Sequence, residues 1–324
     1  MTEASVPRTI ADLFGSDPPS NWGKWGPDDE VGSLNYLTPA EVLRGVASVK
    51  TGQVLTLQVQ IGSTRTKADP VWPNRTSAVR TQTMDEGFFQ RGEVAEPRGG
   101  HHYADDKIEM YLQGSTQYDA LGHLWYDGKI WNGYEASTTI GGLKKASVLP
   151  IAERGVVGRG ILIDVARSRK KRWLERAEGF THADLLEAAA KQGCRIEPRD
   201  ILLVRTGWMG RFYEVPLDEF YAEWNEPGLT YSRELVEWFQ VMEIPNLVTD
   251  TLANEQSFDP ETGIEMRLHC ALMRNLGIAM TEACWLDDLA EACAGDGRWT
   301  FLYTAGPLKV VAGSGAPVNP IVIR

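Results

Sequence analysis

The sequence predicts an α/β fold of an irregular kind, and three observations predict it. Patterns typical of buried strands and of amphipathic helices alternate in the second half of the chain. The first half is mostly strand and loop, with turn-forming residues between the strands. No G-x-G-x-x-G follows a strand and no G-x-x-x-x-G-K or G-x-S-x-G is present. A doubly wound nucleotide-binding sheet and an α/β-hydrolase are therefore disfavoured.

Residues 1–37 are predicted to form an N-terminal arm ahead of a single α/β domain over residues 38–324. The first 30 residues are rich in Pro, Gly and Trp, and include Trp22 and Trp25. Two exposed indole rings would leave a large apolar patch. We therefore expect the arm to dock on a partner chain or on the rim of a pocket.

The elements of the first half follow in order. The T-P-A-E run at 38–41 is a capping box with Pro at the first helical position, and it predicts a helix over about 39–49. Residues 53–61 alternate as a strand does. Residues 62–106 hold several turn formers and little periodicity, so we expect long loops, which are often functional. Strand signals return near residues 108–111.

The second half is more regular. Residues 160–165 and 201–205 are apolar runs that predict buried strands, and residues 247–250 predict a third strand end. Thr181 and Ser232 are predicted N-caps of two helices. A helix over about 265–275 should carry His269. The alternation over residues 299–323 predicts one or two hairpin strands.

Composition limits the partners. The chain has 33 Lys and Arg residues against 44 Asp and Glu residues, a net charge of −11. Nucleic acids and anionic membranes attract basic surfaces, so neither is an expected partner. No apolar run approaches the roughly 18 residues of a membrane span, and no secretory signal begins the chain, so we expect a cytoplasmic protein. The four cysteines form no C-x-x-C pair and are expected to be free thiols.

The densest polar cluster is the run Q-G-S-T-Q-Y-D-A-L-G-H at 113–123. On an extended chain alternate residues share a face, so four polar side chains would point the same way: Gln113, Gln117, Asp119 and His123. Burying them together costs free energy unless they bind something. Spacing alone leaves a binding site and a hydrogen-bonded strand that meets a solvated loop equally open.

This run resembles the signature H-x-G-T-H-x-D-x-x-x-H of the cyclase family, which includes bacterial kynurenine formamidase and isatin hydrolase. Asp119 and His123 match it, whereas Gln113 and Gln117 replace its first two histidines. One branch of the family reads Q-x-S-T-Q-W-D, and the chain is similar to that branch with Tyr118 in place of the tryptophan.

The resemblance covers about residues 20–320, and includes the N-W-G-K-W-G-P-D-D arm at 21–29 and His269 followed by Glu282. It implies the swivelling β/β/α fold of the family, with a mixed sheet and flanking helices in one catalytic domain. It also implies a homodimer or homotetramer that acts on a small-molecule substrate.

Carried over position by position, the resemblance implies that Asp119, His269 and Glu282 are metal ligands and that His123 transfers protons. Gln113 and Gln117 stand at two ligand positions, where an amide oxygen binds more weakly than imidazole and suits Mn²⁺ or Mg²⁺ better than Zn²⁺.

Two versions of the site stay open: one divalent ion, Mn²⁺ or Zn²⁺, or no metal. Without metal, the amide N–H groups of Gln113 and Gln117 could donate to a developing oxyanion. The expected catalytic residues are His123, Asp119 and Gln117.

The function that this resemblance implies is hydrolysis of a C–N or C–O bond in a small cyclic or aryl-linked amide, imide or lactone. An activated water would attack the carbonyl, with His123 as general base and then acid. Two alternatives stay open: a polyketide-type cyclase or dehydratase, and a small-molecule-binding protein that has lost its catalysis.

Overall fold

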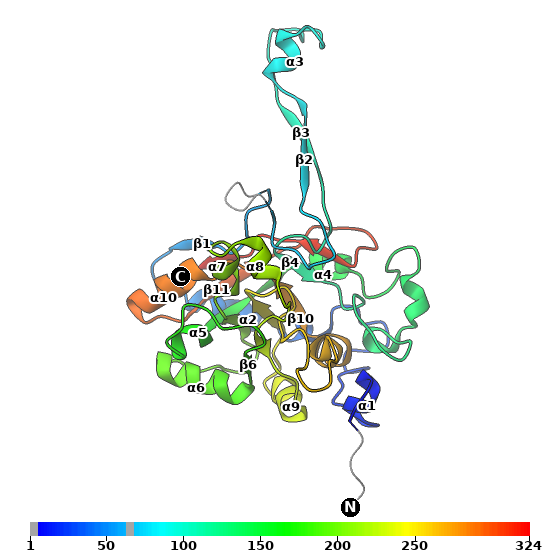
Figure 1. Cartoon of the computed structure of the whole chain (residues 1–324), viewed down its shortest axis with the longest axis vertical. Helices are drawn as coiled ribbons and strands as arrows, with labels where there is room; N and C mark the ends of the chain where they lie inside the picture. Colours follow the sequence, from blue (N-terminus) through cyan, green and yellow to red (C-terminus); the bar gives the residue numbers. More distant parts are fainter. Residues whose placement is uncertain (1–5, 63–67) are drawn as a thin grey trace, which may run out of the picture.

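The computed structural model describes residues 6–62 and 68–324. A nine-stranded mixed sheet forms its centre, in the order β1-β13-β11-β5-β7-β9-β10-β4-β12, and helices surround it (Figure 1). The mixed sheet with flanking helices is as the sequence predicts. The nine strands are β1 (Val54–Thr56), β4 (Gln117–Asp119), β5 (Val156–Asp164), β7 (Ile201–Arg205), β9 (Asn246–Thr249), β10 (Ala279–Glu282), β11 (Thr300–Ala305), β12 (Gly315–Pro317) and β13 (Ile321–Ile323).

Four neighbouring strands, β5, β7, β9 and β10, run parallel, and the strands on either side of them pair antiparallel. All residues of β7, β9 and β10 are buried, and the first four residues of β7 form the apolar run that predicted it. The α-helices are α1 (Ile10–Phe14), α2 (Pro39–Ala47), α3 (Glu86–Gln90), α4 (Val148–Arg154), α5 (Val165–Ser168), α6 (His182–Gln192), α7 (Trp208–Phe212), α8 (Leu217–Tyr221), α9 (Arg233–Val241) and α10 (Asp287–Asp296).

The shorter helical turns are η1 (Gly32–Tyr36), η2 (Trp131–Gly133) and η3 (Ala136–Thr139), and η4 (His269–Asn275) is a π-helix.

Two of the predicted N-caps are confirmed. Thr181 forms a full capping box at α6, and Ser232 accepts the Leu235 amide at α9. The third is right in position, because Thr38 is the N-cap of α2 and Pro39 its first residue. The capping box itself is wrong, because Thr38 makes no side-chain cap and Glu41 pairs with Arg44.

The long loops predicted for residues 62–106 are wrong in part. Strands β2 (Val79–Met84) and β3 (Asp105–Glu109) form an antiparallel ribbon that carries α3 and projects away from the sheet (Figure 1). Every residue of β3 is exposed. A ribbon without a buried face needs no alternation of apolar and polar residues, so periodicity could not reveal it. A third, small sheet pairs β6 (Gly179–Phe180) with β8 (Gly228–Leu229).

The arm docks on its own chain. The indole N–H of Trp22 donates to the carbonyl of Arg274 at 2.8 Å, and the Arg274 guanidinium lies over the Trp22 ring. Trp25 packs edge-on against Tyr36. Neither tryptophan is among the described residues that line the cavity below, so the pocket rim is not where they dock.

The arm is fastened by a close backbone contact at Gly32. This residue has φ of 57°, and a Cβ there would lie 2.3 Å from the carbonyl oxygen of Gly277. We expect Gly32→Ala to lower the free energy of unfolding by about 2–4 kcal/mol, from left-handed strain and overpacking together. Gly52 has φ of 74° and an open Cβ position, so Gly52→Ala should cost only about 1–2 kcal/mol. Denaturant titration measures both, and equal losses would contradict the contact.

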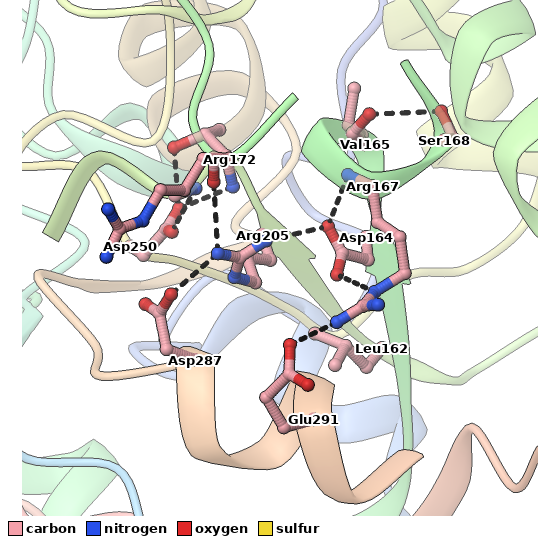
Figure 2. A network of polar contacts seen from close by, with 12 residues as sticks. Leu162, Asp164, Val165, Arg167, Ser168, Arg172, Arg205, Asp250, Asp287 and Glu291 are labelled. Carbon is pink, nitrogen blue, oxygen red and sulfur yellow. Dashed lines mark hydrogen bonds and ion pairs between the residues drawn. The ribbon is translucent and has the colours of Figure 1, made fainter. Parts of the chain in front are cut away.

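Charged side chains of the protein pair with one another at the carboxyl ends of β5, β7 and β9 (Figure 2). Arg205 bridges Asp164 at 3.0 Å and Asp287 at 2.6 Å. Asp250 accepts the backbone amides of Thr206 and Gly207. Parallel sheets usually bind ligands at this edge. The network occupies part of this edge, and the candidate site described below lies further along, at β10 and β4. Among the described residues, no helix has both the length and the apolar character that crossing a membrane requires.

Candidate metal centre and active site

The candidate site lies where β4 and β10 pair antiparallel. Glu282 stands opposite Gln117 in this pair, and Met280 opposite Asp119. Side chains alternate along a strand, so Gln117 and Asp119 share one face. His269, the first residue of η4, brings its Nε2 to 3.1 Å from Oε1 of Glu282.

Asp119, His269 and Glu282 form one buried group whose ligand-type atoms all lie within 4.8 Å of one another. Nε2 of His269 lies 3.8 Å from Oδ2 of Asp119. The other carboxylate oxygen of Asp119, Oδ1, is buried without a hydrogen-bond partner in the described part of the chain. A buried polar atom left in this way costs free energy unless something binds it.

A turn after β4 brings His123 to the same group. Its backbone amide donates to the carbonyl of Ala120, and its Nε2 lies 3.7 Å from Oδ2 of Asp119. The His123 side chain is 22% exposed, so its ring reaches the cavity. The extended conformation that the sequence predicts over 113–123 is wrong outside Gln117–Asp119, because the residues on both sides fold into turns.

The two glutamines lie in different places. The amide of Gln117 donates to Oε2 of Glu282 at 2.7 Å, so it belongs to the buried group. The amide of Gln113 contacts Nδ1 of His123 at 3.4 Å and donates to Ser314 at 3.1 Å. The structure therefore brings Gln113 to the far side of the His123 ring, away from the three ligand-type side chains.

Four of the residues singled out from the sequence line a single cavity of about 340 Å³: Asp119, His123, His269 and Glu282. This convergence is the one expected from the sequence. The rest of the wall consists of aromatic, apolar and polar side chains, namely Trp72, Asn74, Arg75, Tyr111, Leu124, Leu252, Glu265 and Met266.

The acidic groups and histidines of the site shift one another's pKa values. Burial raises the pKa of Glu282, and the nearby Asp119 carboxylate raises it further. Burial alone would lower the pKa of His269, but the carboxylates of Asp119, Glu255 and Glu282 raise it well above its ordinary value. Burial lowers the pKa of His123, which favours its neutral form. The acids around His269 therefore favour a positive charge between them.

The residues fit a divalent metal ion. Nδ1 of His269 lies 2.8 Å from Oε1 of Glu255, and an ionised carboxylate only accepts hydrogen bonds. Nδ1 then carries the proton, and the Nε2 lone pair of neutral His269 faces Asp119 and Glu282. Such a lone pair beside two carboxylates, one with a free oxygen, is a donor set that a cation stabilises.

The comparisons with known proteins identify the family of the chain. A family model described as Cyclase matches residues 53–256. The chain belongs to the cyclase family. The solved structure of a novel cyclase is 32% identical, with a TM-score of 0.85 over 94% of this chain and 98% of that one. The resemblance drawn from the sequence is thereby confirmed.

More distant cyclase-family structures share the fold. Isatin hydrolase A from Labrenzia aggregata, bound to benzyl benzoate, is 19% identical, with a TM-score of 0.57 over 90% of this chain and 98% of that one. Isatin hydrolase A from Ralstonia solanacearum is 18% identical, with a TM-score of 0.58 over 83% of this chain and 91% of that one. No curated protein matches the chain.

Sequence reasoning missed two residues of this cyclase-family site. Asn254 donates to Oε1 of Glu282 at 3.0 Å, and Glu255 contacts His269. Both are fully or almost fully buried. The available signal was the polar run N-E-Q at 254–256, which lies shortly after the predicted strand end at 247–250, but such a run usually predicts a solvated loop.

Proposed function

We propose that this cyclase-family protein is a metal-dependent hydrolase that cleaves a C–N or C–O bond in a small cyclic or aryl-linked amide, imide or lactone. The observation that carries the proposal is the buried group of Asp119, His269 and Glu282, with His123 beside it on the wall of one cavity. An acceptor-rich group next to a neutral imidazole suits the activation of water.

Asp119, His269 and Glu282 would hold one divalent ion. When bound, this ion would polarise the carbonyl of the substrate and lower the pKa of a water molecule. Two carboxylates and one imidazole form a set with more hard oxygen donors than the histidine-rich sites that favour Zn²⁺, so Mn²⁺ is the preferred candidate. Gln117 keeps Glu282 in place by its 2.7 Å hydrogen bond.

His123 moves the protons. Its imidazole takes a proton from the attacking water, whose oxygen bonds to the carbonyl carbon. The bond from that carbon to nitrogen or oxygen then breaks, and His123 returns the proton to the leaving atom. The reaction forms a carboxylate and releases an amine, amide or hydroxyl group, which stays on the same molecule when the substrate is a ring. The amide nitrogen of Gln113 lies 3.4 Å from Nδ1 of this imidazole.

The cavity supports a small ring substrate. Its volume of about 340 Å³ lies near the lower end for small-molecule sites. Trp72 and Tyr111 offer aromatic faces, and Leu252 and Met266 offer apolar contacts. The isatin hydrolases that share the fold also support a ring-opening hydrolysis.

A panel of aryl lactams, cyclic imides and aryl lactones in ¹⁸O-labelled water tests the proposal. We expect turnover of at least one class, with ¹⁸O in the carboxylate product detected by mass spectrometry. Ring closure of an open-chain substrate without ¹⁸O uptake would instead favour the cyclase or dehydratase alternative. Ligand-induced thermal stabilisation without any turnover would favour a binding protein. Either outcome would overturn hydrolysis.

A further inference from the structure

We propose that Glu255 is a positioning residue for His269, one that fixes the tautomer and orientation of the imidazole and so sets the affinity of the site for its metal ion. The inference rests on the proposed metal-dependent function and deepens it. Glu255 is fully buried and is not among the residues that line the cavity, so it acts only through His269.

Three N–H groups contact the Glu255 carboxylate. They are the backbone amide of Leu268, which precedes η4, and the backbone amide and ring Nδ1 of His269. Oε2 of Glu255 accepts the backbone amide of Leu268 at 2.8 Å. Its Oε1 accepts the backbone amide of His269 at 2.8 Å and contacts the ring Nδ1 at 2.8 Å. One oxygen that bonds both the backbone and the ring of His269 restricts the rotation of its side chain. The Nδ1 proton is thereby assigned, and Nε2 is left with its lone pair toward Asp119 and Glu282.

The backbone of Glu255 has no room to shift. It pairs with Leu229 of β8, and the amide of Gln256 donates to the Leu229 carbonyl at 3.1 Å. A Cβ at Gly228 would lie 2.3 Å from the carbonyl carbon of Glu255, so the two backbones are in direct contact. The backbone of Glu255 is therefore held in place, and a residue that positions a ligand must be held in this way.

A purely structural role is the alternative. The bonds to the amides of Leu268 and His269 would by themselves justify a buried glutamate at the start of η4. Only the bond to Nδ1 concerns the metal. The test must therefore read metal affinity separately from stability.

Glu255→Gln removes the charge and keeps the size. We expect it to weaken Mn²⁺ binding about 10- to 100-fold, as loss of an outer partner of a ligating histidine typically does. Electron paramagnetic resonance titration of free Mn²⁺ measures the affinity, and thermal melting of the metal-free proteins measures the stability. The matched control is Asp164→Asn, a fully buried carboxylate that accepts the Arg167 amide and pairs with Arg205, and that bonds to no proposed ligand among the described residues. This control should bind Mn²⁺ within about twofold of the wild type.

Equal Mn²⁺ affinity in Glu255→Gln and the wild type would overturn the inference and leave the proposed function standing. A wild type that binds no Mn²⁺, Zn²⁺ or Co²⁺ would overturn the metal-dependent function instead. If Glu255→Gln does not fold, ¹⁵N-histidine NMR of the wild type loaded with diamagnetic Zn²⁺ decides. Chemical shifts that place the His269 proton on Nδ1 support the inference, and a proton on Nε2 alone refutes it.

Discussion

His123→Ala is expected to lower kcat by about 10²- to 10⁴-fold, the contribution typical of a general acid–base residue. His123 is the imidazole that reaches the cavity wall while its Nε2 lies 3.7 Å from Asp119. Its loss removes both the acceptor for the water proton and the donor to the leaving atom. Metal affinity should change little, because His123 is not one of the three proposed ligands. Steady-state kinetics and Mn²⁺ titration on the same preparation measure the two effects.

His102→Ala is the matched control, because His102 lies on the ribbon and contacts Glu86 there. It should leave kcat within about twofold of the wild type. If His123→Ala also kept kcat within that range, the role of His123 as the proton-transfer residue would have to be abandoned.

Asp119→Asn is expected to abolish both stoichiometric metal binding and hydrolysis. Asp119 faces His123 and His269 with one oxygen, and its other oxygen is the buried atom without a partner. The amide keeps the shape but removes the charge that a cation requires. The loss of metal affinity should exceed the roughly 10- to 100-fold expected for an outer partner, because Asp119 is a proposed ligand.

Mn²⁺ titration and the hydrolysis assay measure the two losses. Asp218→Asn serves as the control, since Asp218 is an exposed carboxylate in the first turn of α8. Full activity in Asp119→Asn, with metal retained, would show that the ion and the chemistry lie elsewhere.

Local sequence patterns correctly predicted the strands and helices whose structure depends mainly on their own residues. The apolar runs at 160–165 and 201–205 became β5 and β7, and Thr181 and Ser232 cap helices as expected. The β2–β3 ribbon escaped prediction because an exposed strand has no apolar face to mark it. The pairing of β4 with both β10 and β12 joins segments far apart in the chain, and no local pattern encodes such a pairing.

Some residues of the candidate site could likewise be predicted from the sequence, and others could not. Asp119 and His123 stand in one short motif, so their proximity could be expected, although a turn rather than an extended strand produces it. His269 and Glu282 were placed by the family resemblance, since nothing in their spacing joins them to β4. Glu255 has no recognisable motif, and its function depends on the contact with His269 that only the three-dimensional structure shows.

The metal content of the purified protein tests the central claim most directly. Elemental analysis of the wild type, after equilibration with Mn²⁺ and removal of free ions, should find about one divalent ion per chain, and chelation should remove the ion and the hydrolytic activity together. Wild-type protein that contains no stoichiometric metal and hydrolyses its substrate at an unchanged rate in the presence of chelator would contradict the account.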